Sequence, residues 1–309
     1  MIPGTRAASA ASPPHPDQQA HQSVPGFPCR DRCLVMGIVN VTPDSFSDGG
    51  PYLAAASAVE HGLALARSGA DIIDVGGEST RPGADRVEAA EELRRVLPVV
   101  RELSGAGVTV TIDTTRSRVA EAALAAGAAG VNDVSGGLAD PAMARLVAGA
   151  HVPYIAMHWR GPSRDMRQRA VYTDVVAEVV AELGARLETL LETGIDRRQV
   201  VLDPGLGFAK RPAHDWQLLN RLDQLRALGQ PVLIGASRKS FLGALLRSGN
   251  GTPPPPARDM ATAAVSALAA AAGAYCVRVH DVTPTLDAVR VAAEWTAPHG
   301  DRARLKEGQ

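Results

Sequence analysis

Short apolar runs alternate with longer segments of helical pattern along almost the whole chain. From Leu34 onward there are eight such runs, each with the length and continuous hydrophobic character of a strand buried on both faces. Most are separated by segments rich in Ala, Leu, Glu and Arg, and several of these segments end at Gly, a common residue at helix ends. Strand–helix alternation repeated eight times predicts one closed (β/α)8 barrel. The apolar runs are 34–41, 70–77, 108–114, 129–136, 153–159, 200–208, 231–237 and 274–282.

A repeated Gly-Ala pair supports the barrel. It occurs at 69–70, 127–128 and 273–274, each time after a helical pattern and before an apolar run with a polar far end. A doubly wound open sheet would share the alternation, but no G-x-G-x-x-G sequence opens a helix after the first run. We therefore predict a TIM barrel over residues 31–298.

The two ends of the chain lack this periodicity. Residues 1–30 are polar and rich in Pro, which predicts a disordered N-terminal tail, and 299–309 are expected to form a polar C-terminal tail. A run of four prolines at 253–256 predicts a stiff surface loop.

Composition excludes several classes of partner. The formal net charge of -1 gives no overall attraction to nucleic acid or to an anionic membrane. No apolar stretch is long enough for a membrane helix, and the N-terminus has no apolar signal-peptide core. Three cysteines, an odd number, favour a reducing compartment. We expect a cytoplasmic protein.

Polar side chains crowd the far ends of the apolar runs, where a barrel builds its active site. Any one of them is more often a helix cap or a loop anchor. Nine at one rim favour a functional site. They are Asn40, Asp74, Asp113, Asn132, His158, Asp203, Ser237, Arg278 and His280.

One part of this set suits a flat, nitrogen-rich ring. Asp113, Asn132 and Asp203 provide acceptors and an amide, and a buried carboxylate that accepts two N–H bonds from a guanidine-like edge would hold such a ring. Apolar faces could come from Leu206, Phe208, Met157 and Val134, although Met157 and Val134 fit an ordinary barrel core equally well.

A second part suits an anion. Arg278 and His280 are two residues apart on one predicted strand, so their side chains point the same way, as phosphate or pyrophosphate binding requires. The alternative is that Arg278 pairs with a nearby carboxylate such as Asp281, which the alternation of the strand directs away. Thr80, Arg81 and Lys239 complete this group.

Two loops at the same rim, 41–50 and 78–84, are rich in Pro, Gly and small polar residues, and we predict mobile lids there. Asn40 precedes the first loop. It could ligate Mg²⁺ beside a diphosphate, because Mg²⁺ usually keeps water molecules and takes oxygens from its substrate.

Nine sequence motifs lie at the ends of the apolar runs and in the segments that follow them: NVTPDSFSDGG (40–50), DVGGESTRPGA (74–84), IDT (112–114), NDVSGG (132–137), MHWRG (157–161), LDPGLGFAK (202–210), GASRKSFLG (235–243), RDMAT (258–262) and RVHDV (278–282). In this order they resemble the motifs of bacterial dihydropteroate synthases. The resemblance extends from residue 34 to about 296, nearly the whole chain. It implies a transferase that condenses 6-hydroxymethyl-7,8-dihydropterin pyrophosphate with p-aminobenzoate, giving 7,8-dihydropteroate and pyrophosphate in folate biosynthesis.

The resemblance also implies a role for each site residue. The pterin would be bound by Asp113, Asn132, Asp203 and Lys239, with Met157 and Phe208 beside it. The pyrophosphate and its Mg²⁺ would be held by Thr80, Arg81, Asn40, Arg278 and His280. The p-aminobenzoate pocket, which sulfonamides would also enter, would be bordered by Phe46, Pro82, Ser237 and Lys239.

Catalysis and assembly are implied in the same way. The catalytic residues would be Asp113, Lys239, Arg278 and His280, whereas His158 is expected to be structural. The resemblance further implies a homodimer.

Two other functions stay open at this point. A related barrel binds methyltetrahydrofolate and passes its methyl group to a cobalamin protein, but it should lack the Ser-Thr-Arg-Pro and Ser-Arg-Lys loops that this chain contains. A non-catalytic dihydropteroate synthase paralogue should have lost residues of the anion group or of the first loop, and these are retained.

Overall fold

The computed structural model describes residues 23–42, 50–79, 86–162, 166, 168–249 and 251–297. Their strands form one parallel sheet in the order β6-β5-β4-β3-β2-β1-β8-β7. A parallel bridge between Leu202 and Val232 joins β6 to β7, and the amide of Leu202 donates to the carbonyl of Pro231 at 2.9 Å. The sheet therefore closes into the predicted barrel. The strands are β1 (Leu34–Asn40), β2 (Ile72–Gly76), β3 (Val110–Asp113), β4 (Gly130–Asp133), β5 (Tyr154–Met157), β6 (Val200–Asp203), β7 (Leu233–Ile234) and β8 (Cys276–Val279).

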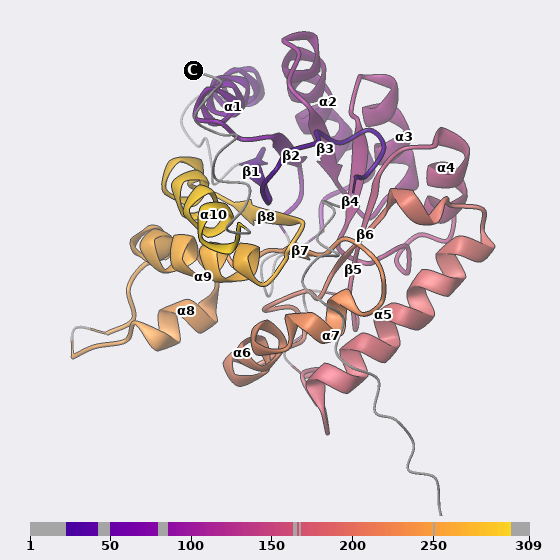
Figure 1. Ribbon diagram of the computed structural model, residues 1–309. Helices are drawn as coiled ribbons and strands as arrows, with labels where there is room; N and C mark the ends of the chain where they lie inside the picture. Colours follow the sequence, from indigo (N-terminus) through magenta and orange to yellow (C-terminus); the bar gives the residue numbers. More distant parts are fainter. Residues whose placement is uncertain are drawn as a thin grey trace, which may run out of the picture.

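Helices surround the strands as an outer ring (Figure 1). Apolar side chains fill the layer between strands and helices, and within the described residues no helix is long and apolar enough to cross a membrane. The helices are α1 (Gly50–Arg67), α2 (Ala89–Gly105), α3 (Ser117–Ala125), α4 (Met143–Ala150), α5 (Val175–Glu192), α6 (Pro212–Asn220), α7 (Leu222–Arg226), α8 (Ser240–Leu245), α9 (Asp259–Ala271) and α10 (Val282–Thr296), with 3-10 turns η3 (Arg197–Gln199) and η4 (Pro255–Arg258).

The repeated Gly-Ala pair is one helix ending used three times. Gly69, Gly127 and Gly273 follow α1, α3 and α9 with φ of 94°, 109° and 86°, a left-handed conformation that favours glycine. In each case the next alanine donates its amide to a carbonyl five residues back, as when Ala70 donates to Leu65 at 3.1 Å. The chain then enters β2, β4 or β8 in the same direction.

The end of the predicted disordered N-terminal tail is ordered and packs against the barrel. Residues 23–30 belong to the predicted disordered tail, yet Val24 is only 1% exposed and packs with Phe27 against the apolar starts of the strands. Arg30 and Arg32 both bond to Asp71, at 2.9 and 2.7 Å. The segment 23–32 therefore covers the end of the barrel opposite the candidate site. The remaining predicted tails, 1–22 and 299–309, lie outside the described residues.

Candidate active site

The carboxyl ends of the strands meet at one rim. The register pairs Asn40 with Gly76, Gly76 with Asp113, and Asp113 with Asn132 across β1 to β4, and it pairs Met157 with Asp203 across β5 and β6. Parallel strands in this register place their terminal side chains at one level. The predicted strand-end residues that the structure describes are therefore brought together.

Asp74 is the centre of a hydrogen-bond network at this rim. Its carboxylate is fully buried and accepts bonds from Thr111 Oγ1 at 2.5 Å, Asn132 Nδ2 at 2.9 Å and Arg278 Nε at 2.6 Å. A carboxylate has no proton to offer, so Asn132 must direct its NH₂ group toward Asp74. The carbonyl oxygen of Asn132 is thereby turned away from Asp74.

Arg278 bridges two carboxylates. Besides the bond to Asp74, its Nη2 donates to Asp113 Oδ2 at 2.8 Å. The sequence favours an anion-binding role for Arg278 over pairing with a carboxylate. The structure shows that Arg278 does pair with carboxylates. Its partners lie on β2 and β3, while Asp281 is the N-terminal cap residue of α10. The two bonds use two of the five N–H donors of the guanidinium.

Burial changes the protonation of Asp113. It raises the pKa of this carboxyl to about 7, against the opposing effect of the Arg278 guanidinium, and the neighbouring Asp74 raises it further. A carboxyl with a pKa near neutrality can accept or hold a proton at physiological pH.

Asp203 and Lys239 carry opposite charges and lie near each other beside the turn 204–209. Burial raises the pKa of Asp203, while the nearby ammonium of Lys239 lowers it. The Lys239 ammonium also donates to the carbonyl of Leu206 and lies 4.9 Å from the centre of the Phe208 ring. This pair therefore places opposite charges beside an apolar and aromatic turn.

Ser237 and His280 are bonded to each other. Ser237 Oγ lies 2.9 Å from His280 Nδ1, and it accepts the backbone N–H of His280 at 3.1 Å. The predicted p-aminobenzoate residue and the predicted pyrophosphate residue thus lie side by side, although they are 43 positions apart.

The other predicted residues divide into two groups. Met157 is buried at the end of β5, Phe208 is partly buried, and Asn40 is partly buried at the end of β1. The remaining four, together with the centres of both predicted lids, lie outside the described residues. They are Phe46, Thr80, Arg81 and Pro82.

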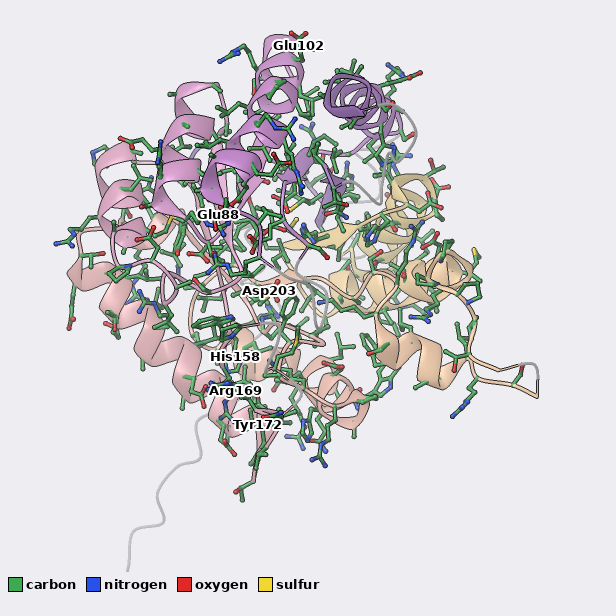
Figure 2. The ribbon with its side chains drawn as sticks, turned by 180° about the vertical axis from the view of Figure 1, so that it is seen from behind. Glu88, Glu102, His158, Arg169, Tyr172 and Asp203 are labelled. Atoms are coloured by element: carbon green, nitrogen blue, oxygen red, sulfur yellow. The ribbon has the colours of Figure 1, made fainter. Side chains whose placement is uncertain are left out.

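His158 lies near Asp203 (Figure 2), and its amide donates to the carbonyl of that residue at 2.8 Å. Its ring is 2.9 Å from Glu182 through Nε2 and 3.0 Å from Lys210 Nζ through Nδ1. Burial lowers the pKa of His158 to about 4. A neutral ring with both nitrogens bonded agrees with the structural role expected for His158.

Sequence reasoning assigned no role to three residues that the structure places in or beside the site. Asp74 stands among the strand ends without a role, Lys210 lies in the LDPGLGFAK motif but is not singled out, and Asp215 has no motif around it. Asp215 is buried in α6 and accepts the amide of Gly207 at 2.7 Å. For Lys210, the signal that could have found it is a charged residue at the end of a glycine-rich turn.

Comparison with known protein families assigns the chain to an enzyme family. The family model described as pterin binding enzyme matches residues 36–280. The chain belongs to this family, whose fold is the barrel described above.

Relatives narrow the family further. The dihydropteroate synthase of Mycobacterium leprae is 56% identical over 263 residues, covering 84% of this chain and 93% of the relative. A Xanthomonas albilineans dihydropteroate synthase solved with 4-aminobenzoic acid has a TM-score of 0.80 and 46% identity, covering 87% of this chain and 95% of that one. A Yersinia pestis dihydropteroate synthase in a sulfonamide drug complex has a TM-score of 0.82 and 38% identity, covering 90% and 100%. The chain therefore belongs to the dihydropteroate synthases, transferases of folate biosynthesis.

Proposed function

We propose that the rim residues of this barrel bind 6-hydroxymethyl-7,8-dihydropterin pyrophosphate and p-aminobenzoate and condense them to 7,8-dihydropteroate. One observation supports the roles proposed for these residues. Hydrogen-bond acceptors and cationic side chains from separate strands lie close together at one rim of the barrel. The acceptors are Asp113, Asn132 and Asp203. The cations Arg278 and Lys239 lie among them. Carboxylates can accept the paired N–H groups of a pterin edge, and the cations suit its anionic substituent.

The reaction needs no protein nucleophile. The C–O bond to the pyrophosphate breaks with its electron pair leaving on the pyrophosphate, and Arg278 and His280 stabilise that developing charge. The buried carboxylates Asp113 and Asp203 offset the positive charge on the pterin methylene. The lone pair of the aniline nitrogen of p-aminobenzoate then forms the C–N bond to the methylene, and the proton released from that nitrogen passes to water.

Mg²⁺ is part of the proposal as a metal that arrives with the substrate. Asn40 would contribute one amide oxygen at the end of β1, and the described residues contain no group of three or more His, Cys, Asp or Glu side chains that could hold a metal. Such a donor set fits Mg²⁺ that takes its other ligands from pyrophosphate and water. The metal would neutralise charge on the leaving pyrophosphate.

A turnover assay with both substrates and Mg²⁺ tests the function directly. Product formation is expected, and Asp203→Asn should weaken binding of the pterin pyrophosphate by roughly 30- to 150-fold, because a lost charge-assisted contact costs on the order of 2–3 kcal/mol. A folded wild-type chain that binds the pterin but forms no product would instead be a non-catalytic paralogue.

We also propose that two copies of the chain pair through α9 and α10, which pack against each other and lie side by side in Figure 1. Large apolar side chains on these helices are exposed, among them Leu268 and Trp295, the latter by 82%. Sedimentation should give twice the chain mass of 32.2 kDa. Leu268→Glu should give monomers, whereas Leu138→Glu, at another exposed leucine, should not; a monomeric wild type would overturn the proposal.

The cytoplasm is the compartment that we propose. Cys29, Cys33 and Cys276 are all free thiols in the structure, which suits a reducing environment. Fractionation of cells that produce the protein would test this.

A further inference from the structure

The turn after β6 has an unusual backbone. Gly205, Gly207 and Ala209 have φ of 67°, 75° and 47°, so every second residue is left-handed, including one that carries a side chain. A Cβ on Gly205 would lie 2.6 Å from the carbonyl oxygen of His158. The turn therefore approaches the end of β5 closely and needs fixed partners to keep its shape.

Four charged side chains supply those partners. The amides of Gly205 and Gly207 donate to the carboxylates of Asp203 and Asp215, both at 2.7 Å. The carbonyls of Leu206 and Phe208 accept from Lys239 and Lys210, the latter at 3.1 Å. Carboxylates thus hold the donors of the turn, and ammonium groups hold its acceptors.

Lys210 extends this arrangement to the end of β5, because its ammonium also bonds to His158 Nδ1. An ammonium group has only protons to give, so His158 Nδ1 must accept. The His158 proton then lies on Nε2, which donates to Glu182 on α5. A chain of bonds therefore runs from Phe208 through Lys210 and His158 to Glu182.

Charged groups surround Lys210 from several elements. Asp203 and Asp215 favour its ammonium form, whereas Lys239 and Arg160 disfavour it. Two histidines with lowered pKa values, His158 and His214, complete the surroundings. Burial is the largest effect and lowers the pKa of Lys210 to about 7.

We propose that Lys210 is a positioning residue for pterin binding, which sets the turn 206–208 against β5 by joining the Phe208 carbonyl to the neutral ring of His158. The inference rests on the proposed function, in which Asp203 at the start of this turn binds the pterin, and on the expected place of Phe208 beside it. Lys210 itself need not touch the substrate.

Lys210→Met tests the role, with Arg211→Met as a control that removes one positive charge from the next, exposed residue. Lys210→Met should raise the Kd and KM for the pterin pyrophosphate about tenfold, the effect of ~1.4 kcal/mol, and change kcat less. Arg211→Met should leave both near wild type. Lys210→Gln keeps an NH₂ donor group on a shorter side chain, so it should recover part of the lost affinity. It also provides a test if Lys210→Met does not fold.

The pH dependence separates positioning from simple packing. Above about pH 7 wild-type Lys210 loses its charge, so its hydrogen bonds weaken. The ratio of the Lys210→Met Kd to the wild-type Kd should therefore be larger at pH 6.5 than at pH 8.5. An equal ratio at both pH values, or a folded Lys210→Met with wild-type pterin affinity, overturns the inference. Absence of turnover in the wild type would instead count against the proposed function.

Discussion

Among single residues, Asp74 has a role that only the structure shows. It bonds to Asn132 and Arg278, two side chains that we propose to contact the substrate. It accepts from both Asn132 and Arg278, so it orients an amide and a guanidinium at once. Asp74→Asn should weaken pterin pyrophosphate binding by about 10- to 100-fold, since charge-assisted bonds to two neighbours are lost. Thr111→Val removes the third donor to the same carboxylate and should change binding little. Calorimetry that found Asp74→Asn equal to wild type would contradict this role.

The buried Asp113 predicts a conflict between binding and stability. Its folded-state pKa, about 7, lies above the ordinary value of 3.8, so the folded state binds more protons between these values. The contribution of Asp113 to stability is therefore present below about pH 4 and is lost as pH rises through 7. Asp113→Asn should bind pterin poorly. Its free energy of unfolding relative to that of the wild type should be higher at pH 8 than at pH 5 by roughly 2–3 kcal/mol, because about two pH units of wild-type titration lie between pH 5 and the folded-state pKa. Denaturant unfolding at both pH values would check the sign.

Among the elements, the segment 23–32 is a structural part of the barrel. Val24 is buried among the apolar starts of the strands. Val24→Ala should lower the free energy of unfolding by about 1–2 kcal/mol, because apolar area is exposed and a small cavity remains. Val171→Ala removes the same atoms from a side chain that is 68% exposed and should have almost no effect. Equal unfolding midpoints for the two variants would show that the segment does not stabilise the barrel.

In the molecule as a whole, both proposed substrate pockets draw on residues from distant parts of the chain. Ser237 and His280 lie together at the rim, next to the proposed pyrophosphate position. We expect a simple sulfonamide to compete with p-aminobenzoate, and to bind only when pterin or pyrophosphate is present. Inhibition that added p-aminobenzoate did not relieve would contradict the pocket assignment. A binding titration with the sulfonamide in the absence of both pterin and pyrophosphate is the control, and no binding is expected there.

The barrel, the positions of its strand ends and the helix endings at Gly-Ala could all be predicted from the sequence, because they depend on local periodicity and local backbone preference. Which charges pair could not be predicted in this way. Arg278 bonds to Asp74 and Asp113, 204 and 165 positions away, rather than to the nearby Asp281. Lys210 likewise reaches His158 across 52 positions. Closure of the sheet brings these groups together, and burial then makes each pairing necessary, since an unpaired charge in the interior is strongly destabilising.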